Sequence, residues 1–89
     1  MTTDEMRQEI QKGRESLKTL SDEVRVRLHL GGMEARDAWA KLSDEAEKLG
    51  HRLAHETTDS ARAALEDLVR RVRELVASLR QQPPSQHDR

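Results

Sequence analysis

The amino-acid sequence predicts an all-helical protein, and three observations support this fold class. Apolar residues recur at steps of three, four or seven along most of the chain, which is the spacing of one helix face. Charged residues make up 37% of the 89 residues and hydrophobic ones 34%, with high helical periodicity; this composition is typical of long helices and coiled coils. Trp39 is the only aromatic residue, so the core must come from aliphatic side chains, which suits narrow helix–helix seams.

The first helix is predicted from about residue 4 to about residue 56. Thr2, Thr3 or Asp4 can cap its start, and early acidic residues suit the positive end of the helix dipole. Its narrow apolar stripe predicts coiled-coil-like packing; the residues are Met6, Ile10, Leu17, Leu20, Val24, Leu28, Ala35, Ala38, Leu42, Ala46, Leu49 and Leu53. The alternating segment 24–30 resembles a strand, but we interpret it as helix because no other segment could pair with it.

Gly31 and Gly32 leave two architectures open. Glycine often ends a helix, and inside one it costs about 1 kcal/mol relative to alanine, so a break here predicts a three-helix bundle. The three helices would span about 4–30, 33–56 and 59–80. However, no Ser, Thr, Asp or Asn lies nearby to cap a new helix, and the apolar stripe crosses the pair in phase. We therefore favour a continuous first helix in a long antiparallel hairpin with coiled-coil packing.

The last helix is predicted over about residues 60–80, after a turn at 57–59. Thr58 or Asp59 can cap its start. Its apolar residues step alternately by four and three along one face; they are Ala61, Leu65, Leu68, Val72, Leu75 and Leu79. A short loop between the two helices makes them antiparallel neighbours.

The remaining chain forms a polar tail. Pro83 and Pro84 stop the last helix, and the residues around them are polar. We therefore expect one helical domain over residues 1–80 and a disordered tail over residues 81–89.

The lengths of the two predicted helices indicate self-association. A first helix of about 53 residues is about 80 Å long, whereas a last helix of about 22 residues covers only about 33 Å of it. The stripe from Met6 to Leu28 would then face water, although each large apolar side chain gains about 1.5–3 kcal/mol by burial. This predicts a symmetric homodimer or a complex with a helical partner protein. The predicted interface residues are Leu17, Leu20, Val24, Leu28 and Trp39.

The sequence shows no pattern of catalytic residues. Without cysteine, the chain has no thiol nucleophile. Adjacent acidic residues, such as Asp22 and Glu23, fall on polar helix faces, where neither burial nor fixed geometry tunes a carboxyl group for catalysis. We therefore predict that the protein is not an enzyme and has no catalytic residue and no cofactor.

His51 and His55 are the candidate metal ligands, because they are four residues apart and would share one helix face. Arg52 stands where the zinc-protease motif has its glutamate, and only His29 could approach as a third ligand if the chain folds back. The sequence therefore predicts no metal site.

Charge and hydropathy bear on other partners. The chain has 16 basic and 17 acidic residues, so nothing draws it generally to nucleic acid. The alternative function is a nucleic-acid-associated protein that uses an arginine-rich stretch in the last helix. Acidic residues lie between these arginines, and the stretch has no aromatic residue that could stack on a base. The arginines are Arg62, Arg70, Arg71, Arg73 and Arg80. No secretory signal or membrane-spanning run is evident, so we expect a cytoplasmic protein that does not insert into membranes.

The segment 24–42 covers about a fifth of the 89 residues. It resembles small bacterial helical-hairpin and coiled-coil proteins without an assigned activity. It includes the run from Arg27 to Trp39. The resemblance implies a long-helix hairpin or coiled coil, and no functional residue can be carried over from it. Together these patterns predict a non-enzymatic structural or protein-interaction module that self-associates by coiled-coil packing.

Overall fold

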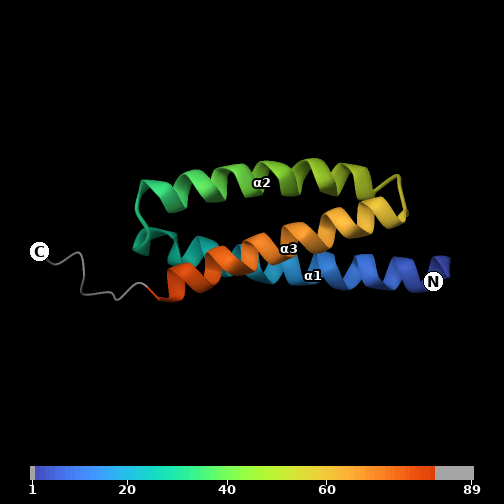
Figure 1. The fold of residues 1–89 in the computed structure, drawn as a ribbon, viewed down its shortest axis with the longest axis horizontal. Helices are drawn as coiled ribbons and strands as arrows, with labels where there is room; N and C mark the ends of the chain where they lie inside the picture. Colours follow the sequence, from blue (N-terminus) through green and yellow to red (C-terminus); the bar gives the residue numbers. More distant parts are fainter. Residues whose placement is uncertain (1, 82–89) are drawn as a thin grey trace, which may run out of the picture.

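The computed structural model describes residues 2–81 and contains three α-helices and one short 3₁₀ turn (Figure 1). Helix α1 spans Thr3–Arg27, α2 spans Met33–Leu53 and α3 spans Asp59–Arg80, and the 3₁₀ turn Leu28–Leu30 follows α1. The chain runs up, down and up, so α3 runs in the same direction as α1 and opposite to α2. The all-α prediction is confirmed, and no strand forms in residues 2–81.

The continuous first helix predicted over residues 4–56 is wrong, because the chain breaks at its glycine pair. Gly31 and Gly32 are extended, with φ and ψ of −91° and 164° and of −90° and −157°. Gly31 lies against the end of α3, where an added Cβ would be 2.9 Å from Leu79 Cδ2 and would clash with Ala35. Gly32 is the N-cap of α2 without any side-chain hydrogen bond. The three-helix alternative is therefore the fold that the chain adopts.

Among the capping candidates, Thr2 begins α1 and Thr58 begins α3. Thr2 accepts a hydrogen bond from the Glu5 backbone N–H at 3.2 Å, and the Glu5 carboxylate accepts one from the Thr2 N–H at 2.9 Å. At α3, the Thr58 hydroxyl accepts a hydrogen bond from the Ala61 N–H at 3.1 Å. Each such cap satisfies N–H groups that a first helical turn leaves without partners, and it contributes about 1 kcal/mol.

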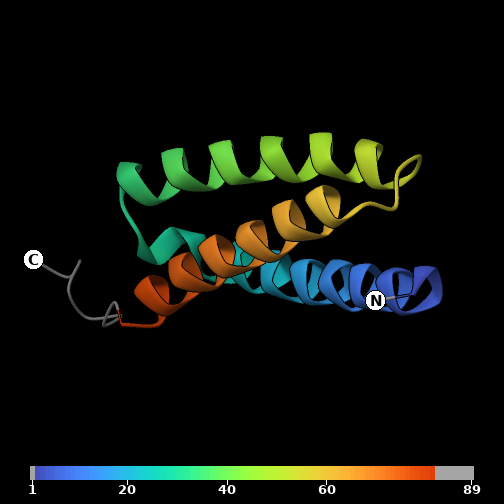
Figure 2. The same cartoon turned by 45° about the vertical axis from the view of Figure 1, so that its right-hand side comes forward.

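Helix α3 is the centre of the core. It contributes seven buried residues, whereas α1 contributes three and α2 contributes two. They are Met6, Ile10, Val24, Leu42, Leu49, Ala61, Leu65, Leu68, Val69, Val72, Val76 and Leu79. Figures 1 and 2 show α3 crossing diagonally between the two outer helices. Consequently α1 and α2 each pack closely on α3 and less closely on each other.

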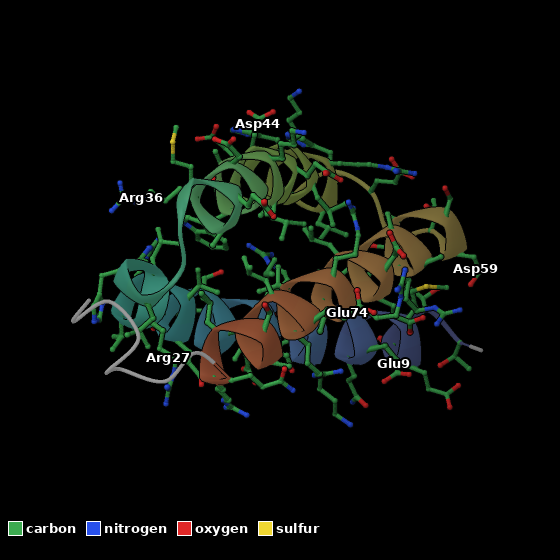
Figure 3. The ribbon with its side chains drawn as sticks, turned by 60° about the vertical axis from the view of Figure 1, so that its left-hand side comes forward. Glu9, Arg27, Arg36, Asp44, Asp59 and Glu74 are labelled. Carbon is green, nitrogen blue, oxygen red and sulfur yellow. The ribbon has the colours of Figure 1, made fainter. Side chains whose placement is uncertain are left out.

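Two arginines of α3 link it to its neighbours. Arg80 donates hydrogen bonds of 2.6 and 2.8 Å to the Glu23 carboxylate on α1, and Arg71 donates two to the Glu45 carboxylate on α2. Such two-pronged pairs fix the relative orientation of the helices, although exposed ion pairs add little stability. Figure 3 shows other charged side chains, including Asp44, extending outward from the bundle. The predicted tail lies outside the described residues, apart from Gln81.

Candidate functional site

The five residues predicted at a dimer interface lie within or beside the core of a single chain. Val24 has no exposed surface. Leu17, Leu20, Leu28 and Trp39 are half-buried and pack against the core. The expectation that the N-terminal arm stands open to water is therefore wrong, because α3 covers it after the chain folds back at the glycines. Leu17 also lines the groove between α1 and α2, so it remains available to a partner, whereas the fully buried Val24 does not.

An apolar groove with a volume of ≈ 300 Å³ lies between α1 and α2. Its half-buried floor is mainly apolar and consists of Leu17 and Ser21 from α1 and of Ala46, Gly50 and Leu53 from α2. The groove exists for two reasons. The outer helices pack on α3 more closely than on each other, and Ala46 and Gly50 are too small to fill the space between them.

The space between α1 and α2 extends over Gly50. Gly50 lies inside α2, where glycine costs about 1 kcal/mol relative to alanine. A Cβ added to Gly50 would meet no atom within 4 Å, whereas one added to Gly13 would lie 2.6 Å from Leu65 Cδ2. Nothing within the described chain therefore requires a glycine at position 50.

The rim of the groove is basic along α1. The exposed side chains there are Arg14, Lys18, Asp22 and Arg25, so three bases face one acid and leave a net charge of +2. Arg25 pairs with Asp22 at 3.4 Å. Within residues 2–81, neither Arg14 nor Lys18 forms an ion pair. The rim therefore presents two cations that are available to an anionic partner.

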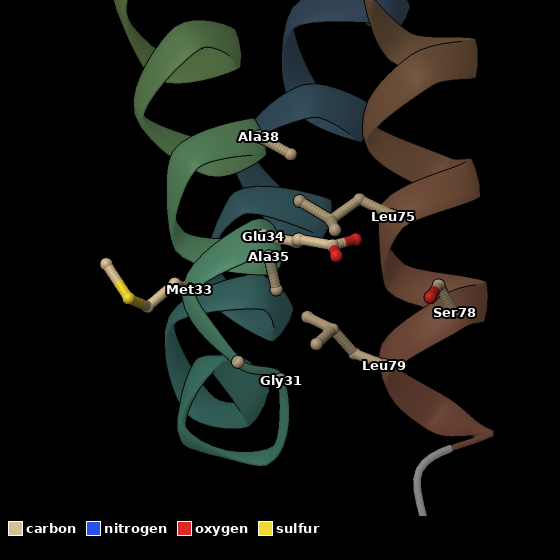
Figure 4. Close-up of a pocket in the computed structure, with 9 residues that line it drawn as sticks. Gly31, Met33, Glu34, Ala35, Ala38, Leu75, Ser78 and Leu79 are labelled. Carbon is tan, nitrogen blue, oxygen red and sulfur yellow. The ribbon is translucent and has the colours of Figure 1, made fainter.

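A second hollow, of ≈ 520 Å³, lies between the start of α2 and the end of α3 (Figure 4). Ala35, Leu75 and Leu79 point toward one another across it, while Met33 points away. Met33 is 78% exposed, and Glu34 is the one charged residue among those that line the hollow. This notch is therefore apolar, but its lining carries little charge that would select a partner.

The carboxyl groups with displaced pKa values are held in their ionised form. Each of the five shifts is downward; the groups are Glu5, Glu23, Glu45, Glu56 and Asp67. For Glu56, hydrogen bonds from Arg52 and then from the Thr58 hydroxyl lower the pKa to about 2. A general acid at neutral pH needs a shift in the opposite direction. These groups act as ion-pair and capping partners.

The expected continuous helix through His51 and His55 does not form. Helix α2 ends at Leu53, so His55 lies in the following turn. His29 lies in the 3₁₀ turn near the opposite end of α2. In the part of the chain that the structure describes, no group of three His, Cys, Asp or Glu side chains is placed to hold a metal ion.

The arginines of α3 are mostly engaged by carboxylates. Arg62, Arg70, Arg71 and Arg80 form ion pairs within α3 or with a neighbouring helix. Arg73 forms none with the other residues of the 2–81 range. A phosphate backbone would have to displace these pairs, so the arginines form a weaker anion-binding surface than their number indicates.

The groove residues Arg14, Lys18 and Gly50 were not predicted as site residues. The sequence does hold a signal for the rim, because Arg7, Arg14, Lys18 and Arg25 recur at steps of seven, four and seven and so share one flank of α1. It holds no signal for the space beside Gly50, which depends on the distance between α1 and α2.

Comparisons with known families and structures do not extend this description. Among residues 2–81, no helix combines the length and the apolar character needed to cross a membrane. Comparison of the chain with protein family models, with curated proteins and with solved structures finds no match. The groove and its basic rim are therefore the features from which we infer a function.

Proposed function

We propose that the protein is a non-enzymatic helical interaction module that associates by helix packing, with a second copy of itself or with another helical protein. The groove between α1 and α2 carries this proposal. Its apolar floor stays half-buried, and Gly50 leaves room for an incoming side chain. A further helix in the groove would remove apolar surface from water, at about 25 cal/mol per Å², and would complete a four-helix arrangement.

The charged groups support helix packing over the other classes of function. The displaced carboxyl pKa values are lowered by arginines or by a helix cap, which suits a solvated, ion-paired surface. The arginines of α3 that could contact phosphates are mostly neutralised by neighbouring acids. The groove between α1 and α2 combines a mainly apolar floor with two rim cations, Arg14 and Lys18, that form no ion pair within residues 2–81.

Site-specific photo-cross-linking in the full chain tests this proposal. A photo-activatable residue replaces Lys18 or Asp22, which are exposed on the rim of the groove and leave its floor open. The matched control replaces Ala63, which is exposed on α3. On irradiation in the cells that make the protein, we expect cross-linked products from positions 18 and 22 and none from position 63. A product of twice the chain mass identifies self-association, and any other mass identifies a different partner.

Two results would reject the interaction module. One is the absence of product at both groove positions in variants whose circular dichroism shows native helix content. The other is equal cross-linking at position 63, since random encounters label every exposed position alike.

A further inference from the structure

We infer that the occupant of the groove is an amphipathic helix of another protein with acidic residues along one flank. The inference rests on the proposed function and specifies the class of partner. It follows from three properties of the groove: the charge on its α1 wall, the size of the residues on its α2 wall, and the lack of a matching flank on this chain.

The α1 wall selects for acidic residues. Arg14 and Lys18 are exposed at the rim without an ion pair in residues 2–81, and Arg7 and Arg25 extend the same flank at a spacing of seven residues. From Arg7 to Arg25 the flank is about 27 Å long. A partner helix with carboxylates spaced by three, four or seven residues would meet these cations along about five turns.

The α2 wall selects for a helix that approaches closely. Ala46 and Gly50 line the groove, and Ser43 continues the same side of α2 one turn before Ala46. The free space over Gly50 can receive the end of a leucine or methionine side chain, which would pack between Leu17 and Leu53. A nucleic acid has charge for the rim but no apolar ridge for this floor.

The described helices of this chain offer no acidic flank that is free of bases. The acids of α3 all pair with arginines, as Glu74 does with Arg70. On α2, Glu34, Asp37 and Glu47 are exposed without an ion pair in residues 2–81, but Lys41 and Lys48 are interspersed among them. A second copy therefore matches the basic wall less well than a partner whose acidic flank is not interrupted by bases.

The test uses the full chain and three labelled synthetic helical peptides of about three heptads, a length at which helices become stable enough to compare. All three share a leucine seam, and their flanks carry glutamate, glutamine or lysine. By fluorescence anisotropy, we expect the glutamate peptide to bind at least about tenfold more tightly than the lysine peptide. We also expect its affinity to fall as salt increases.

Two variants locate the binding. Gly50→Leu fills the groove without meeting another atom of the chain at its Cβ, and it should weaken the glutamate peptide by at least about tenfold, which is about 1.4 kcal/mol. Ala63→Leu adds the same bulk on the exposed side of α3 and should leave the affinity unchanged. The double variant Arg14→Glu with Lys18→Glu should reverse the preference toward the lysine peptide, which an unfolded protein cannot do.

Several outcomes would overturn the inference. These are equal affinity for the three peptides, no effect of Gly50→Leu, or a dimer by light scattering that Gly50→Leu dissociates. Tighter binding of a DNA duplex that competes with the glutamate peptide would also overturn it. The cross-linking experiment decides the proposed function separately, because it detects any occupant of the groove regardless of its charge.

Discussion

The seam between α1 and α3 is closely packed at its glycine, Gly13, whereas the seam between α1 and α2 is open at its glycine, Gly50. In the first seam, Gly13 lets Leu65 approach so closely that an added Cβ would lie 2.6 Å from Leu65 Cδ2. In the second seam, Gly50 faces open space. A glycine on an apolar helix stripe can therefore mark either a close contact between two helices or an unfilled space beside the helix.

Polar contacts reinforce the difference between the seams. Arg80 holds the Glu23 carboxylate across the α1–α3 seam with two hydrogen bonds. Within residues 2–81, no ion pair or side-chain hydrogen bond joins α1 to α2. The second seam is thus held together mainly through the common neighbour α3.

The largest expected contrast comes from shortening one leucine in each seam. Leu65 is 1% exposed in the core, and Leu65→Ala should lower the free energy of unfolding by about 2–5 kcal/mol, because it leaves a cavity. Leu17→Ala should cost less than half as much, because Leu17 already borders the open groove. Urea unfolding followed by circular dichroism measures both; equal losses would show that the groove is not open in solution.

A smaller contrast comes from adding one methyl group to each glycine. Gly50→Ala should raise the free energy of unfolding by about 0.5–1 kcal/mol, because alanine favours the helix and its Cβ meets nothing. Gly13→Ala should lower it, because the buried Leu65 must move. In a Leu65→Ala background, the same Gly13→Ala change should become stabilising. A stabilising Gly13→Ala in the native background would contradict the close approach of α1 and α3.

The smallest expected effect concerns acid stability at the α2–α3 turn. Glu56 has a pKa of about 2 in the folded protein, below its ordinary value of 4.5, because Arg52 and Thr58 donate to its carboxylate. A lowered folded-state pKa means that the stabilisation is complete above about pH 4.5 and is lost as pH falls toward about 2. Glu56→Gln should therefore flatten the fall of the melting temperature across this range. An identical pH profile in Glu56→Gln would rule out this contribution.

The sequence predicts the parts of the fold that depend on neighbouring residues. Thr2 and Thr58 begin helices because their hydroxyls need only partners three residues ahead. The final helix follows from a stripe that stays in phase from Ala61 to Leu79, and the structure places it at Asp59–Arg80. Local signals of this kind are sufficient because helix hydrogen bonds are themselves local.

The break at Gly31 and the groove at Gly50 depend on distant residues instead. The apolar stripe crosses the glycine pair in phase, but Gly31 is required by Leu79, which the sequence alone does not place beside it. The missing capping residue argued for a continuous helix, yet Gly32 caps α2 without a side chain. Likewise, the space over Gly50 appears only once α1 lies opposite at its observed distance.

Trp39 gives the molecule an optical property that follows from its place in the fold. The chain contains no tyrosine, phenylalanine or cysteine, so one indole is the source of its ultraviolet emission. Trp39 is half-buried against the core on α2, on the same side as Ala46 two turns later. The wavelength and intensity of that emission therefore report how much water reaches the face of α2 that leads to the groove.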